Sequence, residues 1–417
     1  MTTTIPAVDV SRTRGFDSSA AFLLDGYRFG QRRFARFGAP YFSTRILGRA
    51  ALVVKGADAA RAFYENDHFS RDRAMPTSVV HLLQDEGSVQ ALSAEPHFHR
   101  KQLFVRLLAS DRSIDEVVRI FGEEWELAVA AWPERVVLLE SLWPVLTRTA
   151  LRWVGIPLER ADVAVLARQL QAMVDSAGAF GPKNWRARAM RLQAEEWARA
   201  VIEDVRSDRL VVDEGSAVHE LAHHRDSDGA ALTVETAAVE LINVLRPVGA
   251  IARFITFEAH ALRVHPGVRS ELRSGSLDTV SFVHEVRRYY PFFPVIGGRV
   301  RMPFEWHGIP FEVGEWVLLD LFATNRDEAT WTEAERFLPH RFDAWKGDPN
   351  TLVPQGAGDV SLGHRCPGER ATIEIMAEAA RRLIALDGFS VPPQDLRISL
   401  RSFPAAPESG FVLERRD

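Results

Sequence analysis

The sequence predicts a mainly α-helical protein with small β-sheets. Leu, Ala, Val and Trp recur at spacings of three and four residues almost without a break over residues 116–205, which is the spacing of helices with one buried face. Segments with the composition of strands are few and short. Hydrophobic residues make up 46% and charged residues 26% of the 417 residues, a balance that excludes a disordered or fibrous chain.

The first predicted elements are a helix and a hairpin. A helical stretch contains Phe22, Phe29 and Phe34. It precedes two segments, 41–47 and 50–54, in which β-branched and aromatic residues are punctuated by glycine. We expect these two segments to pair as a small hairpin before the long helical region begins.

The second half of the chain is organised around one long helix. Residues 213–229, which are rich in Asp, Ser, Gly and His, are predicted to form a polar connection. Thr233 is a typical amino-terminal cap for a helix that ends before His265-Pro266. Short strands are predicted within 295–321 and again near the carboxyl end.

Charge and hydropathy exclude several classes of partner. The net charge is -5, from 51 basic and 56 acidic residues with no basic cluster, which argues against a nucleic-acid-binding surface. The amino-terminal segment lacks the apolar stretch of a signal peptide, and charged residues interrupt every hydrophobic run before it could span a bilayer. We therefore expect a cytoplasmic protein without a membrane anchor.

Cys366 is the only cysteine, so all cysteine chemistry must occur at this position. A glycine-rich loop, 354–368, delivers it to the start of a helix that ends at Asp387-Gly388. A helix amino terminus offers free backbone donors and a positive dipole end, which favour a thiolate over a thiol. A thiolate is the form that binds a metal, although a lone cysteine without such a context is usually a small buried hydrophobic residue.

Arg246 lies inside the long helix on a face that is not charged. Its neighbours three and four residues away are small or mostly apolar: Ile242, Asn243, Gly249 and Ala250. The side chain is therefore predicted to point inward, where a guanidinium needs an anionic partner, either a ligand carboxylate or phosphate or an internal Asp or Glu. Pro247 removes a backbone donor and is predicted to bend the helix at this point.

A second motif suggests a different chemistry. His219, Glu220 and His223 stand in the pattern of zinc hydrolases, in which the two histidines bind zinc and the glutamate activates water. Glu235 or Glu240 could supply a third ligand by distance along the chain. The motif is short, and its polar surroundings indicate an exposed connection, so zinc hydrolysis is the weaker alternative.

Four further motifs accompany the cysteine loop. They are Arg246-Pro247, Glu285-Val286-Arg287-Arg288, Asn325-Arg326-Asp327 and Phe337-Leu338-Pro339-His340-Arg341-Phe342. In this order and spacing, over residues 26–413, they resemble the cytochrome P-450 superfamily, and more narrowly its bacterial fatty-acid peroxygenases. The resemblance implies a single haem-thiolate domain over 1–417, with residues 1–15 loosely ordered. It places haem b between a long kinked distal helix and the proximal cysteine loop.

The resemblance implies roles for four residues at the cofactor. Cys366 would be the axial thiolate ligand of the haem iron, and His97, Lys101 and Arg71 would contact the haem propionates. His97 and Lys101 are four residues apart and share a helical face, which from spacing alone is more typical of a charged surface helix.

A carboxylate–arginine pair is expected to be structural. Glu285 and Arg288 are three residues apart on a predicted helix, which by itself indicates an exposed ion pair of about 0.2–0.5 kcal/mol. The resemblance implies instead a buried network with Arg341 that braces the proximal loop.

The resemblance also implies the reaction. Arg246, with Pro247, would hold a fatty-acid carboxylate above the iron, and this carboxylate would assist the cleavage of hydrogen peroxide. Hydroxylation is then expected at the α or β carbon, with decarboxylation to a terminal alkene as a minor outcome and no obligatory redox partner. Gln90 matches a family position over the haem, and Phe292 matches a position in the hydrophobic substrate channel.

Two departures from the common superfamily pattern favour the peroxygenases. Residues 245–251 lack the acid and threonine that oxygen-using members carry on this helix. The cysteine loop holds Asp359 and Leu362 where the common pattern has Phe and Gly, with Gly363 three residues before the cysteine. The nearest alternative is an oxygen-dependent monooxygenase that needs redox partners, and a further one is a non-catalytic haem protein that senses or carries a lipid or a gas.

Overall fold

The computed structural model describes residues 10–13, 15–85 and 87–416. The segment 1–15, predicted to be loosely ordered, lies mostly outside the described residues. The helices are α1 Ser19–Asp25, α2 Arg28–Phe37, α3 Ala57–Tyr64, α4 Thr77–Leu83, α5 Ala94–Leu108, α6 Asp111–Ala131, α7 Leu138–Val154, α8 Val163–Asp175, α9 Pro182–Arg206, α10 Ala217–His223, α11 Val234–Val264, α12 Pro266–Ser274, α13 Thr279–Tyr289, α14 Leu321–Thr324 and α15 Glu369–Ile384, with short 3-10 turns at Leu158–Arg160 and Pro339–Phe342.

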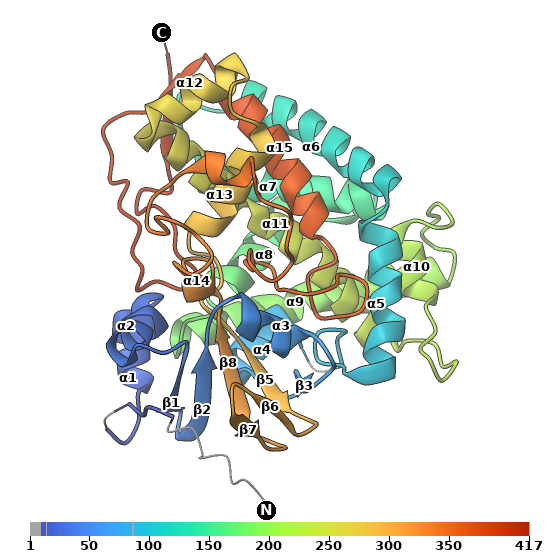
Figure 1. Ribbon diagram of the computed structural model, residues 1–417. Coiled ribbons are helices and arrows are strands. Elements are labelled where there is room, and N and C mark those ends of the chain that lie inside the picture. Colours follow the sequence, from blue (N-terminus) through green and yellow to red (C-terminus); the bar gives the residue numbers. More distant parts are fainter. Residues whose placement is uncertain (1–9, 14, 86, 417) are drawn as a thin grey trace, which may run out of the picture.

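The strands are β1 Tyr41–Ile46, β2 Arg49–Val54, β3 Phe69–Ser70, β4 Arg135–Val137, β5 Val295–Val300, β6 Phe304–Trp306, β7 Ile309–Phe311, β8 Trp316–Asp320, β9 Phe389–Ser390 and β10 Val412–Arg415. The predicted hairpin is confirmed as β1 and β2, which join β8, β5 and β3 in a five-stranded sheet. This sheet lies at one side of a larger helical body (Figure 1). The prediction of a mainly α-helical fold with small sheets is therefore confirmed.

The long helix is confirmed with its predicted ends. The side chain of Thr233 accepts a hydrogen bond from the backbone N–H of Thr236 at 3.1 Å, which caps α11. The helix ends at Val264, before His265-Pro266. Almost every residue of α11 from Ala237 to Leu262 is buried, because other helices pack around it.

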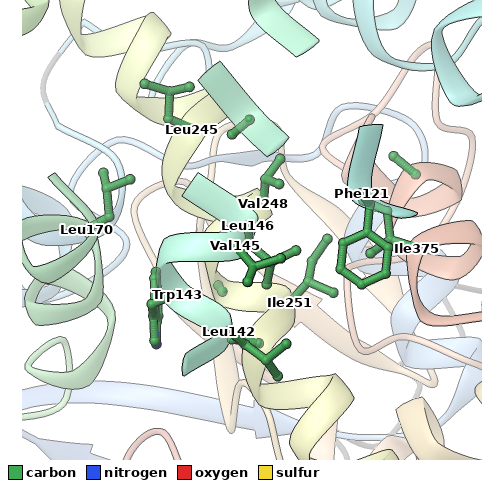
Figure 2. Close-up of a cluster of buried hydrophobic side chains, with 14 of the residues drawn as sticks. Phe121, Leu142, Trp143, Val145, Leu146, Leu170, Leu245, Val248, Ile251 and Ile375 are labelled. Carbon is green, nitrogen blue, oxygen red and sulfur yellow. The ribbon is translucent and has the colours of Figure 1, made fainter. Parts of the chain in front are cut away.

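The core lies where α11 crosses α7. Figure 2 shows Leu142 and Leu146 of α7 facing Val248 and Ile251 of α11. Gly249 permits this close approach, because a Cβ atom at this position would lie 2.5 Å from the ring of Trp143. The packing fixes α11 as the rigid element on which the candidate site is built.

One prediction along the chain needs correction, that of the connection 213–229. The region 116–205 is helical almost throughout, as predicted, and β4, a strand of three residues that pairs with β10 near the carboxyl end, lies between α6 and α7. The connection 213–229 contains the helix α10. The side chain of Ser216 caps this helix by accepting from the N–H of His219, and Val218 and Leu221 form its fully buried face. Small residues and two buried apolar side chains were enough to form a helix in a segment of polar composition.

None of the helices formed by the described residues combines the length and the apolar character that a membrane span requires.

Candidate active site

A cavity of about 310 Å³ lies between α11 and the loop that precedes α15. It is lined by seven of the eight residues that the resemblance assigns to the cofactor or the substrate: Gln90, His97, Lys101, Arg246, Pro247, Phe292 and Cys366. The eighth, Arg71, lines an adjoining cavity together with His97. The fold therefore brings together residues that are up to about 300 positions apart in the sequence.

Cys366 lines this cavity and lies just before the first turn of α15. Its backbone N–H donates to the carbonyl of Gln355 at 3.0 Å, which fixes the loop. Burial raises the pKa of the Cys366 thiol, against the lowering effects of the Lys101 charge and of hydrogen bonds from Gly368 and Gln355. The backbone donor at the helix terminus thus favours the thiolate, as expected, and burial opposes it. A bound metal cation would deprotonate this thiol.

The loop is held by a buried ion-pair network that the sequence analysis did not identify. Arg287 on α13 pairs with Glu369 and donates to the side chain of Gln355 at 3.1 Å. Arg365 donates to the other Glu369 oxygen at 2.5 Å. Both ends of the cysteine loop are thus tied to α13, so the position of the sulfur is set by the scaffold.

The predicted Glu285–Arg288–Arg341 network is present, with Glu285 and Arg288 fully buried and Arg341 half-buried. Arg288 forms a bidentate pair with Glu285 at 2.7 and 2.8 Å, and Arg341 approaches the same carboxylate at 3.2 Å. Arg288 also donates to the backbone carbonyls of Asn325, Ala334 and Arg336. Its connection to the cysteine loop is indirect, through the side chain of Asn325, which accepts from the N–H of Val353.

A cluster of cationic and imidazole side chains faces the cavities beside Cys366. Lys101 donates to the carbonyl of Arg365, and Arg71 donates to the carbonyl of Gly297 at 2.8 Å. The ring of His97 stacks on that of His364, with centroids 3.9 Å apart. Burial, followed by the charges of Lys101 and Arg71, lowers the pKa of His97 to about 4, and burial lowers the pKa of Lys101 to about 8.

This cluster has the character of an anion site, because Arg71, His97 and Lys101 are buried and destabilise one another's positive charge. His364 belongs to it, although the sequence analysis did not identify it. Its position two residues before the cysteine was the available signal. A half-buried thiol, a group of buried cationic side chains and a cavity between them fit a haem, whose iron the sulfur would bind and whose propionates the cations would contact.

A glycine in the cysteine loop supports this fit. Gly356 has a φ of +102° and lies in close contact with neighbouring groups. A Cβ atom there would lie 3.0 Å from the Tyr64 hydroxyl and 3.1 Å from the Cα of Arg365. The loop can therefore pass close to Tyr64 and still line the cavity.

Arg246 points inward from α11, as predicted, and its guanidinium is buried. It donates to the carbonyls of Leu82 and Leu83, at 3.3 and 2.5 Å, and to the side-chain oxygen of Asn243 at 3.2 Å. These acceptors are all uncharged. Burial lowers the pKa of Arg246 to about 9; the charge of Arg191 lowers it further and that of Asp85 raises it. The guanidinium would gain stability from an anion in the cavity.

Pro247 is exposed where α11 borders the cavity, although the residues on both sides of it are buried. Its lack of an N–H leaves the carbonyl of Asn243 without its usual helical donor. Arg246 and Pro247 thus present a buried charge and an apolar ring side by side at the cavity.

Asn243 connects the two predicted polar residues of the cavity. Its amide nitrogen donates to Gln90 at 3.1 Å and to Glu240 at 3.2 Å, while its oxygen accepts from Arg246. Glu240 in turn pairs with Arg100 at 3.1 Å and is fully buried. The sequence analysis gave Asn243 no role of its own, because its partners lie in distant segments.

A second, apolar cavity of about 150 Å³ continues the first toward α1 and the β1–β2 turn. Phe292 lines both cavities and stacks on Phe254 of α11, with ring centroids 4.4 Å apart. The predicted position of Phe292 in an apolar channel is consistent with this arrangement. The two cavities share Phe292 and other apolar lining residues, and Arg246 lines the first of them.

The zinc motif does not form a comparable site. His223 is used in a hydrogen bond to the carbonyl of His219, at 3.0 Å, and both residues lie on α10 away from the cavities. Among the residues that the structure describes, no group of three or more His, Cys, Asp or Glu side chains could hold a metal ion.

Comparison with known proteins supports the haem interpretation. The family model for cytochrome P-450 matches residues 279–383, which include α13 and Cys366. Cytochrome P-450 3A14 of Cavia porcellus is 27% identical over 198 residues, 42% of this chain and 38% of that protein. Cytochrome P-450 26C1 of Homo sapiens is 27% identical over 166 residues, 39% of this chain and 31% of that protein. The match thus spans well under half the length of these curated relatives.

Three solved structures are similar over almost the whole chain. Cytochrome P-450EX alpha (CYP152N1) with myristic acid is 38% identical, with a TM-score of 0.93 and coverage of 97% of this chain and 98% of that one. Cytochrome P-450SP alpha (CYP152B1) in complex with (R)-ibuprofen is 40% identical, with a TM-score of 0.92 and coverage of 96% and 98%. A variant of cytochrome P-450 OleT in complex with arachidonic acid is 31% identical, with a TM-score of 0.92 and coverage of 98% of both chains.

Proposed function

Because this chain belongs to the cytochrome P-450 family, with its similar solved structures in the CYP152 branch, we propose that it is a fatty-acid peroxygenase. It would use hydrogen peroxide to hydroxylate a long-chain fatty acid at the α or β carbon, with decarboxylation as a minor outcome. No obligatory redox partner is needed in this proposal.

Haem b is the cofactor of this family. Cys366 would be its thiolate ligand, and Arg71, His97, Lys101 and His364 would hold its propionates. When bound, the haem supplies transfer of an oxygen atom from peroxide to a C–H bond. The chain's own contribution is to keep the sulfur in place through Arg287 and Glu369 and to neutralise the propionates.

The observation that carries the proposal is the buried guanidinium of Arg246, which lines a mostly apolar cavity. Among the described residues, the hydrogen-bond acceptors of this guanidinium are neutral, and a cation in such a desolvated site is stabilised by a carboxylate. A fatty acid has the complementary structure, with one carboxylate and a long apolar chain. Arg246 would hold the first, and the space beside Phe292 would hold the second.

The same anchor accounts for the proposed regiochemistry. A carboxylate that is fixed at one point of a cavity also fixes the carbon atoms next to it, so these reach the reacting centre and distant ones do not. The carboxylate can also accept and return the proton of peroxide, which a protein acid would otherwise do. Residues 245–251 contain no acid or threonine for that purpose. Gln90, held by Asn243, would border the same reacting region.

A binding titration tests the role of the carboxylate. The haem-loaded protein is titrated with myristic acid and with the primary alcohol of the same length, and binding is followed through the shift of the haem absorption band. The acid should bind about 10- to 100-fold more tightly, because a charge-assisted hydrogen-bond pair is worth about 1.5–3 kcal/mol. Equal affinity for the alcohol would contradict the proposal.

A further inference from the structure

We propose that Tyr27, which lines neither cavity, positions Phe292 and thereby selects the chain length of the substrate. The inference rests on the proposed function, since it concerns how the apolar channel receives a fatty-acid chain. Tyr27 would be a positioning residue that acts through Phe292 and makes no contact with the substrate.

The first observation is the location of the Tyr27 hydroxyl. Tyr27 precedes α2 and is 1% exposed. Its hydroxyl donates to the backbone carbonyl of Phe292 at 2.5 Å and accepts from the N–H of Ala405 at 3.4 Å. One hydroxyl therefore joins two segments that are far apart in the sequence.

The second observation is that both segments line the channel. Phe292 lies between α13 and β5, outside regular secondary structure. It borders both the cavity that Arg246 and Cys366 line, called the inner cavity from here on, and the second, apolar cavity, called the outer cavity. Phe403 and Pro404, directly before Ala405, line the outer cavity. The ring of Tyr27 packs against Phe403 with centroids 5.0 Å apart. Tyr27 thus contacts two segments that line the outer cavity, although it does not line the cavity itself.

The third observation is that the hydroxyl is a constant donor. Burial raises the pKa of Tyr27, so its proton stays in place throughout the working pH range. The backbone N–H of Tyr27 also donates to the carbonyl of Leu400 at 2.8 Å, which anchors the residue itself. The donor to Phe292 is therefore held by rigid neighbours.

Loss of the hydroxyl would affect one part of the channel selectively. The Phe292 carbonyl would lose the Tyr27 donor, and the segment would shift to find another. Arg246 lines only the inner cavity and is held by other contacts. The carboxylate end of a substrate should therefore bind as before, while a chain long enough to pass Phe292 should bind less well.

The test compares Tyr27→Phe with a matched control, Tyr290→Phe. Tyr290 is also a buried tyrosine, at 3% exposure, two residues from Phe292. Its hydroxyl contacts Nδ1 of His260 at 2.8 Å, and it lines neither cavity. Both variants lose one buried hydroxyl, so a general loss of stability should affect them alike. Haem content and melting temperature verify that each is folded.

Dissociation constants are measured for saturated acids from octanoic to stearic acid through the shift of the haem absorption band. Tyr27→Phe should weaken binding of the longest acids roughly three- to tenfold and leave the shortest unchanged, which corresponds to the loss of about one net hydrogen bond. Tyr290→Phe should keep the wild-type dependence on chain length.

The outcomes separate this inference from the proposed function. A Tyr27→Phe variant with the wild-type dependence on chain length, or with the same change as Tyr290→Phe, would overturn the role of Tyr27 while the wild type still binds fatty acids. If the wild type binds no fatty acid of any length, the proposed function fails, and this inference fails with it.

Discussion

The side chain of Asn243 lies one turn before Arg246 on α11 and accepts a hydrogen bond from its guanidinium at 3.2 Å. Because Asn243 also donates to Gln90, the orientation of the anchor and that of the second polar residue of the cavity depend on one amide. The buried Glu240–Arg100 pair holds this amide from the other side. The arrangement is a preorganised polar end to an otherwise apolar channel.

Replacing Arg246 by Ala should remove fatty-acid oxidation and leave the haem content unchanged. The substitution deletes the carboxylate anchor, and no ligand of the cofactor is involved. Turnover of a saturating fatty acid should fall about 100-fold or more, in keeping with the loss of a charge-assisted anchor that also orients the substrate. Arg246→Lys, which keeps the charge without the planar fork, should recover part of the activity. Normal activity in Arg246→Ala would refute the anchor.

Replacing Asn243 by Asp should weaken fatty-acid binding roughly tenfold. The new carboxylate would accept from Arg246 at the position of the present amide oxygen and would compete with the substrate for the guanidinium. Asn243→Ala, which adds no charge, should have a smaller effect. Dissociation constants measured for both variants decide the point, and an Asp variant that binds like the wild type would show that Asn243 does not control Arg246.

Replacing Cys366 by Ala should abolish the thiolate-type absorption spectrum of the haem. No other cysteine is present in the chain, so no second thiolate can replace it. Absorption spectroscopy of the purified variant checks the expectation, and haem content is measured in parallel. Retention of the wild-type spectrum would show that another residue is the axial ligand.

Glu258 should make the stability of the protein dependent on pH. It is fully buried in α11, and within the described part of the chain neither of its carboxylate oxygens has a hydrogen-bond partner. Burial raises the pKa of Glu258 well above its ordinary value of 4.5, so the folded protein retains a proton that the unfolded chain releases. With respect to this carboxyl, the free energy of unfolding is highest below about pH 4.5, where the carboxyl is protonated in both states. The free energy of unfolding then falls as the pH rises toward the folded-state pKa, because the unfolded chain ionises first.

Glu258→Met, of similar volume, should therefore raise the melting temperature at pH 8 and have less effect near pH 5. A gain of about 1–3 kcal/mol at pH 8 is expected from removing an unsatisfied buried polar group. Thermal unfolding of both proteins at the two pH values measures it. A stabilisation that does not change with pH would mean that the carboxyl is not the cause.

The sequence was sufficient for features that depend on local patterns. The cap at Thr233, the inward direction of Arg246 and the delivery of Cys366 to the start of a helix follow from helical spacing and turn composition, and the structure confirms each. These are properties of residues within one or two helical turns of each other.

The features that the sequence did not reveal depend on pairing between distant segments. The partner of Glu369 is Arg287, and that of Phe292 is Tyr27, each on an element that is adjacent only in the folded chain. The rise in the pKa of Cys366 was not predicted for a related reason, because the helix terminus is visible in the sequence and the desolvation of the thiol is not. Short strands such as β4 are stabilised by their partner strand and have no signal of their own.

Peroxygenase activity is tested most directly by mixing the purified haem protein with a long-chain fatty acid and hydrogen peroxide, with no reductase and no reduced nicotinamide, and identifying the products by mass spectrometry. A peroxygenase should form 2- or 3-hydroxy acids, with hydroxylation confined to the carbons next to the carboxylate that Arg246 holds. Products that form only after electron-transfer partners are added, or hydroxylation at remote carbons, would contradict this activity.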